Sequence, residues 1–241
     1  KNKKFTLNTK NNLKDILKLT QGLILISGPT GSRKTTTLYS ILKELNSDDK
    51  KIITVEDPIE YKIDSINQVP INNKVGLSFE LVLKNILRQD PDIIFIGEIR
   101  DKFSLDIALQ ASLTGHLVLA SIHASSSVET ITRLIDLKAD PFLISTTLKA
   151  VMAQRLVLAH CKSCENGCKK CNFTKFYDRT SISEILKVDE QISSLIFNKA
   201  SFNELKEYLK NINFKTMLDD GKQKVKDGLT TLEEVYKVVN F

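Results

Sequence analysis

The segment GPTGSRKTTT, residues 28–37, contains most of a phosphate-binding loop. The nucleotide-binding pattern requires a glycine, four free positions, and then glycine, lysine and serine or threonine. Gly28, Lys34 and Thr35 fit this pattern, but Arg33 stands where the second glycine is required. In such a loop, backbone N–H groups surround a β-phosphate, and the N-terminus of the following helix favours the negative charge. The expected nucleotide-binding residues are Gly28, Pro29, Thr30, Gly31, Ser32, Arg33, Lys34, Thr35 and Thr36.

Arg33 is expected to weaken phosphate binding without changing the fold. Its Cβ costs about 1 to 2 kcal/mol if φ is positive at this position. Its guanidinium binds carboxylates as well as phosphates, so it can pair with nearby acids when no nucleotide is bound. A simple turn between strand and helix is the alternative. We disfavour it because Lys34 and Thr35 stand where the β- and γ-phosphates and Mg²⁺ require an amine and a hydroxyl.

Acidic residues follow two further predicted strands. Glu56 and Asp57 follow KIITV, and Glu98 follows DIIFIG. The carboxyl ends of parallel strands face one crevice, so these acids are expected to converge on the loop. Gly97 stands where an aspartate typically holds Mg²⁺. We therefore expect Glu56 or Asp57 to act on the metal side with Thr35, and Glu98 to activate the attacking water.

His123 ends a third predicted strand, HLVLASIH. A single histidine of this kind is commonly a hydrogen-bonded core or capping residue. Its placement at a strand end shared with the acids favours a role in sensing the γ-phosphate. The expected catalytic residues are thus Glu98, His123 and Glu56.

All four cysteines lie in CKSCENGCKKC, as Cys161, Cys164, Cys168 and Cys171. Two C-x2-C pairs in a chain from a reducing compartment favour a four-thiolate zinc site over disulfides. An iron–sulfur cluster and free thiols are the alternatives. A catalytic zinc is disfavoured because four thiolates leave no open coordination position.

Strands and helices alternate around these motifs. Continuous apolar strands separated by helices predict an α/β fold with a mainly parallel sheet covered on both faces. A helix containing Leu13, Ile16 and Leu17 is expected before it, and SISEILKVDEQISSLIF and two later stretches have helical spacing. The predicted strands are 22–27, 51–55, 92–97 and 116–121, and the predicted helices between and after them are 35–45, 78–89, 103–113 and 127–137.

Four parts are expected along the 241 residues. They are an N-terminal helix and linker (1–21), a nucleotide-binding core (22–160), a metal-binding loop (161–175) and a helical C-terminal part (176–241). The first residue is not Met, which suggests a further N-terminal domain. Neither a signal peptide nor a run of about 18 apolar residues is visible, so the expected location is the cytoplasm.

The net charge of +6 and a pI near 9.0 are compatible with a nucleic-acid or lipid surface. The lysines are scattered along the whole chain, which is typical of a compositional bias. We therefore expect no direct nucleic-acid contact.

Five segments, taken together, resemble one known family. LILISGPTGSRKTTTLYSIL, ITVEDPIEY, LRQDPDIIFIGEIRD, LTGHLVLASIHAS and AQRLVLAHCKSC resemble in order and spacing the Walker A, Asp box, Walker B, His box and tetracysteine regions of the secretion ATPases of type II secretion and type IV pilus assembly. The resemblance runs from about residue 22 to the C-terminus. It implies a RecA-like P-loop ATPase core, a homohexameric ring, Mg-ATP hydrolysis, and docking on inner-membrane platform proteins.

The resemblance also implies residue roles and departures. It pairs His116 with His123, and it matches Arg88, Arg100 and Arg155 to arginines that can face a neighbouring subunit. Besides Arg33, the chain departs from the family at Phe103, Ser104, Leu105, Ala124 and Ser125, which affects the expected catalytic rate.

Three functions remain open at this stage. The leading one is an ATP-hydrolysing motor for type II secretion, (pseudo)pilus assembly or competence DNA uptake, peripheral at the inner membrane. The tetracysteine loop favours assembly or secretion over pilus retraction. A nucleotide-binding ring subunit with turnover impaired by Arg33 is the main alternative, and a conjugation-type DNA-transfer ATPase is disfavoured by the metal loop.

Overall fold

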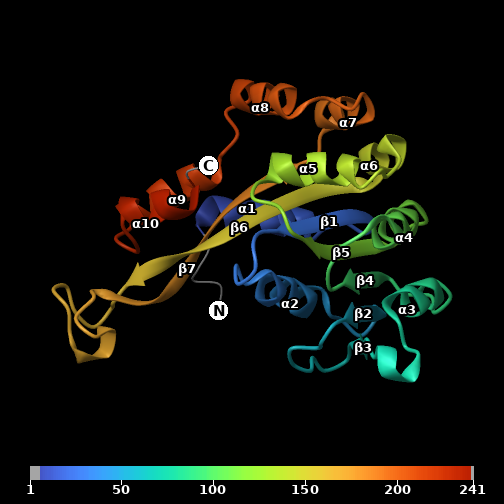
Figure 1. The fold of residues 1–241 in the computed structure, drawn as a ribbon, viewed down its shortest axis with the longest axis horizontal. Helices are drawn as coiled ribbons and strands as arrows, with labels where there is room; N and C mark the ends of the chain where they lie inside the picture. Colours follow the sequence, from blue (N-terminus) through green and yellow to red (C-terminus); the bar gives the residue numbers. More distant parts are fainter. Residues whose placement is uncertain (1–5, 240–241) are drawn as a thin grey trace.

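A seven-stranded sheet with the order β3-β2-β4-β5-β1-β6-β7 forms the centre of the molecule (Figure 1). The structure is a computed structural model that describes residues 6–239, so residues 1–5 of the predicted N-terminal part and the last two residues of the chain lie outside it. Neighbouring strands are parallel except for β6 and β7, and the predicted α/β fold is confirmed. The strands are β1 (Gly22–Ser27), β2 (Ile52–Glu56), β3 (Asn67–Pro70), β4 (Ile93–Ile96), β5 (Leu117–Ile122), β6 (Leu148–His160) and β7 (Phe176–Lys187).

Helices cover both faces of this sheet, which is why its central strands are apolar throughout. In β1, Leu23 and Leu25 pack on one face, whereas Ile24 and Ile26 pack on the other. The first face carries α3 (Phe79–Ile86), α4 (Lys102–Leu113), α5 (Ser127–Asp136), α6 (Pro141–Thr147), α7 (Glu190–Phe197) and α8 (Phe202–Asn211). The second face carries α1 (Leu7–Ile16) and α2 (Lys34–Leu45).

The antiparallel strands β6 and β7 form a long hairpin that extends beyond the rest of the sheet (Figure 1). The cysteine segment 161–175, with the 3-10 turn η2 (Lys169–Cys171), connects the two strands at the far end of the hairpin. The register places Leu158 of β6 opposite Arg179 of β7, with an irregularity between Leu158 and His160. The hairpin therefore links the cysteine segment 161–175 directly to the sheet.

The helical prediction for the stretch that begins at residue 181 was wrong over its first part, because that part belongs to β7. Ile182, Ile185 and Leu186 have the spacing of one helix face. In the structure, however, each packs into a different hydrophobic cluster. The strand is buried from Thr180 to Leu186, so the alternation of polar and apolar residues that reveals a half-exposed strand is missing.

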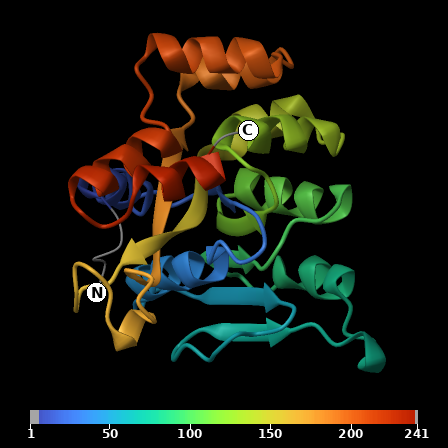
Figure 2. The same cartoon turned by 60° about the vertical axis from the view of Figure 1, so that its left-hand side comes forward.

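Helices α9 (Met217–Lys226) and α10 (Leu232–Val239) pack against the hairpin, as Figure 2 shows, and with α7 and α8 they form the expected helical C-terminal part. Asp220 of α9 is buried and accepts hydrogen bonds from Thr6 Oγ1 at 2.6 Å, the Ser183 backbone N–H at 2.9 Å and Lys224 Nζ at 3.1 Å. Burial lowers the pKa of Lys224, and the Asp220 charge opposes this shift. Within residues 6–239, none of the helices combines the length and the apolar character needed to span a membrane.

Candidate functional site

The loop of residues 28–33 connects β1 to α2 at the carboxyl edge of the sheet. The chain passes very close to itself at Gly28. A Cβ there would lie 2.4 Å from the Gln154 carbonyl oxygen and 2.5 Å from Ser32 Oγ, so only glycine fits this position. The first glycine of the sequence pattern therefore has a steric reason in this fold.

Gln154 of β6 holds the loop in place. Its Nε2 donates to the Ser32 carbonyl at 2.7 Å, and its Oε1 accepts from Thr37 Oγ1 at 2.9 Å. The Gln154 side chain is fully buried and thus ties the loop to the first turn of α2. Ser32 Oγ is also buried, and it has no hydrogen-bond partner among the residues that the structure describes. An unpaired buried hydroxyl in this loop fits the presence of a polar ligand.

Arg33 adopts the left-handed conformation, with φ 65° and ψ 36°, directly before α2. A residue with a Cβ is strained there by about 1 to 2 kcal/mol. The strain that the sequence predicts for a positive φ at Arg33 is therefore present. The Arg33 Nη2 atom lies 3.5 Å from Oδ1 of Asp178 in β7. The expected pairing of this arginine with an acid is thus present, and the acid comes from the hairpin.

Lys34 is folded back on the loop that precedes it. Its Nζ donates to the Gly28 carbonyl at 2.8 Å and to the Pro29 carbonyl at 3.3 Å. Burial lowers the pKa of Lys34, and the nearby charge of Glu98 opposes this shift. The amine therefore lies beside the loop backbone, next to the space that a bound phosphate would occupy.

Glu98, just after β4, is held between two basic side chains. Its Oε1 lies 2.5 Å from His123 Nε2, and its Oε2 accepts from Arg100 Nε at 2.6 Å. The hydrogen bond to Glu98 raises the pKa of Arg100. Arg100 Nη1 also lies 4.0 Å from Asp57 Oδ2, so Asp57 joins the same charged group. This arrangement holds both oxygens of the Glu98 carboxylate in a fixed orientation.

Glu56 is buried at the end of β2 and is held by donors from the protein. One of its oxygens accepts from Tyr39, and the other accepts from Thr54 at 2.6 Å and Gln68 at 3.1 Å. Burial and the hydrogen bond to Glu56 raise the pKa of Tyr39. Since both Glu56 oxygens have protein partners, Asp57 is the more accessible of the two acids predicted on the metal side.

A cavity of about 820 Å³ brings most of the predicted site residues together. Eleven of them line it, namely Thr30, Gly31, Ser32, Arg33, Lys34, Thr35, Thr36, Glu56, Asp57, Glu98 and His123, and Arg100 lines it as well. A cavity of this size suits a small-molecule ligand such as a nucleotide. The Thr35 hydroxyl and the Asp57 carboxylate are the oxygen ligands that Mg²⁺ prefers.

Other residues singled out in the sequence lie away from this cavity. His116 precedes β5, at the opposite end of that strand from His123, and its Nδ1 lies 3.0 Å from the Ala111 carbonyl. Arg88 is exposed after α3, and Arg155 is half-buried on β6. Neither lines the cavity.

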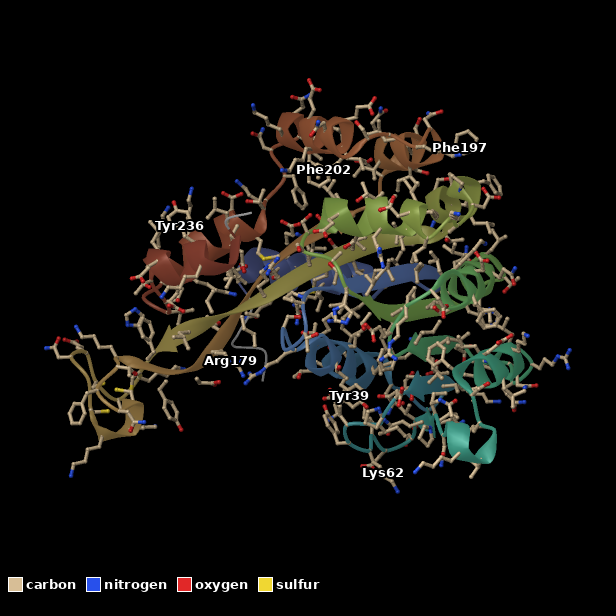
Figure 3. The ribbon with its side chains drawn as sticks, in the orientation of Figure 1. Tyr39, Lys62, Arg179, Phe197, Phe202 and Tyr236 are labelled. Atoms are coloured by element: carbon tan, nitrogen blue, oxygen red, sulfur yellow. The ribbon has the colours of Figure 1, made fainter. Side chains whose placement is uncertain are left out.

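Two parts of the site were missed in the sequence. Arg179, labelled in Figure 3, lines the cavity from β7, and Gln154 holds the loop from β6. Both follow the nucleotide-binding loop by many residues. Gln154 lies in the segment AQRLVLAHCKSC, in which sequence reasoning assigned a role to Arg155 and the cysteines but none to Gln154, and Arg179 lies in no interpreted motif. The pairing of β6 with β7 is the signal that would have placed them.

The four cysteine sulfurs form one cluster and lie within 4.8 Å of one another. Sγ–Sγ distances of 4.0 Å (Cys161–Cys168), 3.6 Å (Cys164–Cys171) and 3.8 Å (Cys168–Cys171) are close to the roughly 3.8 Å expected around a tetrahedral zinc with Zn–S bonds of about 2.3 Å. The Cys168 N–H donates to Cys171 Sγ at 3.2 Å and lowers the pKa of that thiol to about 6. The donor set therefore fits a closed structural zinc site.

Comparison with known sequences agrees with these features. The family model described as type II/IV secretion system protein matches residues 1–237. The type II secretion system protein HxcR of Pseudomonas aeruginosa is 42% identical over 94% of this chain, and the type II secretion system ATPase E of Vibrio cholerae is 41% identical over 97%. The type IV pilus assembly ATPase PilB of Thermus thermophilus is 40% identical over 92% of this chain. The chain spans 50%, 51% and 28% of the lengths of these three relatives.

Two solved structures share the fold over almost the whole chain. The pilus retraction motor PilT with bound ADP matches with a TM-score of 0.81, with 30% identity over 99% of this chain and 66% of that one. The ATPase DotB of Legionella pneumophila matches with a TM-score of 0.77, with 27% identity over 98% of this chain and 65% of that one. Both are described as motors or ATPases.

Proposed function

Because this chain belongs to the type II/IV secretion system protein family, we propose that it binds Mg-ATP and hydrolyses it as the motor unit of a secretion or pilus-assembly machine. The observation that carries this proposal is the cavity in which the phosphate loop meets Glu98, His123 and Asp57. The combination of a phosphate loop, an oriented carboxylate and oxygen ligands for a divalent ion suits phosphoryl transfer to water.

In the proposed reaction, the loop N–H groups and Lys34 bind the phosphates, and Thr35 and Asp57 hold Mg²⁺. When bound, Mg²⁺ neutralises charge on the phosphate oxygens. Glu98 orients the attacking water and takes its proton. His123 and Arg100 keep the two Glu98 oxygens fixed. Glu56 lines the same cavity, and Tyr39 and Thr54 hold its carboxylate in place by donating hydrogen bonds to it.

The partners and the location are proposed on the same basis. The family of the chain supports a homohexameric ring that acts at the cytoplasmic side of the inner membrane and docks on platform proteins. The cysteine cluster supports a structural Zn²⁺ and assembly or secretion in place of retraction. Relatives about twice as long support an additional N-terminal domain as a further partner within the same protein.

The test is Glu98→Gln, which keeps the side-chain volume and removes the base. We expect ATP turnover to fall by at least about a hundredfold while Mg-ATP affinity stays within a few-fold. Glu80→Gln, which alters an exposed acid paired with Lys84, is the matched control and is expected to keep full turnover. Full hydrolysis by Glu98→Gln would contradict the assigned role.

A second proposal concerns the rate. Arg33 in the left-handed conformation, paired with Asp178, favours a motor unit with slow turnover. Steady-state hydrolysis of the Arg33→Gly variant compared with the unchanged chain tests this. Equal rates would contradict it.

A further inference from the structure

Arg33 and Asp178 are related by an unusual backbone feature. Both have positive φ, 65° for Arg33 and 72° for Asp178, a conformation that favours glycine. Their side chains meet at 3.5 Å and are 37% and 49% exposed. Two strained, non-glycine positions are thus joined by an ion pair that lies in contact with solvent.

The pair connects the nucleotide cavity to the cysteine hairpin. Arg33 lines the cavity from the phosphate loop, and Arg179, which directly follows Asp178, lines it from β7. On the other side of Asp178, the Cys161 N–H donates to the Lys175 carbonyl at 2.8 Å and closes the cysteine loop. Asp178 therefore lies along β7 between the cysteine cluster and Arg179, which lines the cavity.

The phosphates of the proposed substrate and the carboxylate of Asp178 bind the same kind of group, the guanidinium of Arg33. A guanidinium pairs with carboxylate and with phosphate through the same donors. The phosphates are expected next to Lys34, which adjoins Arg33 in the loop. A phosphate in the loop and the carboxylate of Asp178 then compete for the Arg33 side chain.

We propose that Asp178 is a positioning residue of the nucleotide site, which holds the Arg33 guanidinium against the hairpin and releases it to the nucleotide phosphates. This inference rests on the proposed function. Nucleotide binding then unlatches the cysteine hairpin from the phosphate loop. Because nucleotide binding and the Arg33–Asp178 ion pair compete for the same guanidinium, loss of the ion pair tightens nucleotide binding, and nucleotide binding loosens the hairpin.

The test uses Mg-ADP, whose β-phosphate occupies the loop and which is not hydrolysed there. Asp178→Asn removes the charge, and asparagine tolerates the left-handed conformation, so the variant is expected to fold. An exposed ion pair changes an equilibrium constant by up to about fivefold. Calorimetry is therefore expected to give a two- to fivefold lower Kd for Mg-ADP, and the difference is expected to shrink in high salt.

Two further variants make the result specific. Arg33→Gln removes the guanidinium but keeps the backbone restriction, and in this background Asp178→Asn is expected to have no effect. Glu165→Gln removes another exposed acid of the same hairpin and is expected to leave the Kd unchanged. As an independent readout, Mg-ADP is expected to raise hydrogen exchange in residues 161–178 of the unchanged chain but not of Arg33→Gln.

An unchanged or higher Kd for Asp178→Asn overturns the inference, as does an equal decrease in the Arg33→Gln background. If the unchanged chain does not bind Mg-ADP, the proposed function itself fails. The two failures are therefore distinguished by a single titration.

Discussion

The Nε2 atom of His123 lies 2.5 Å from Oε1 of Glu98, so the segments that follow β5 and β4 are joined by a direct side-chain contact. These two residues follow neighbouring parallel strands, which pair with Ile96 beside Ala120 in the register. The contact fixes one oxygen of Glu98 and leaves the orientation of the carboxylate dependent on the histidine.

Loss of this contact is expected to slow hydrolysis more than it weakens binding. His123→Ala removes the partner of Glu98 Oε1, and we expect kcat to fall by about ten- to a hundredfold with a small change in KM. His116→Ala is the matched control, since it removes a histidine at the other end of β5. Equal effects of the two substitutions on kcat would contradict the assignment.

Gln154 is expected to be essential for the shape of the phosphate loop. Gln154→Ala leaves the buried Ser32 carbonyl and Thr37 hydroxyl without this partner. We expect the free energy of unfolding to decrease by about 1 to 3 kcal/mol and the affinity for Mg-ADP to fall. Chemical denaturation and calorimetry measure the two effects, and Gln110→Ala on the exposed side of α4 is the control. A variant with unchanged stability and affinity would show that the loop holds its shape alone.

Restoring glycine at position 33 is expected to tighten Mg-ATP binding. Glycine frees a backbone that is now held at φ 65°, and a recovered strain of about 1 to 2 kcal/mol corresponds to roughly 5- to 30-fold in affinity. Arg33→Gln separates the two causes, because it removes the guanidinium and keeps the strain. Calorimetry that finds the same affinity for Arg33→Gly and the unchanged chain would show that the arginine is tolerated.

The raised pKa of Tyr39 predicts a dependence of stability on alkaline pH. The unfolded tyrosine loses its proton near pH 10, whereas the folded one keeps it to higher pH. The contribution of Tyr39 to stability is therefore complete below about pH 10 and decreases as the pH rises above it. Phenylalanine has no hydroxyl to titrate, so Tyr39→Phe does not show this decrease. The difference in the free energy of unfolding between the unchanged chain and Tyr39→Phe is therefore expected to narrow between about pH 9 and pH 11. A constant difference over this range, measured by urea denaturation, would exclude the effect.

The cysteine cluster is expected to bind one zinc ion tightly. Metal analysis of protein prepared without chelator is expected to give about one equivalent, and Cys164→Ser is expected to give much less. Ser163→Ala, a change at the neighbouring position, serves as the control. Less than about half an equivalent of zinc per unchanged chain would contradict the zinc assignment.

The sequence predicts this site well where local pattern and sheet geometry suffice. A strand, a glycine-containing loop and a helix identify residues 28–36, and the rule that parallel strands end at one edge brings Glu98 and His123 beside them. Gln154, Asp178 and Arg179 depend on how the hairpin packs against the loop, which no local pattern contains. The strand β7 was missed for a related reason, because burial of both its faces removes the alternation that identifies strands.

The carboxylate of Asp220 has a consequence for how the chain opens. It joins Thr6, just before α1, to Ser183 in β7 and Lys224 in α9, so segments from the beginning, the later middle and the end of the chain share one buried group. Helix ends usually fray independently. Here, opening α9 leaves the Thr6 hydroxyl and the Ser183 backbone N–H without their acceptor. We therefore expect the N-terminal helix and α9 to open as one cooperative unit, so that their amides exchange with a common free energy.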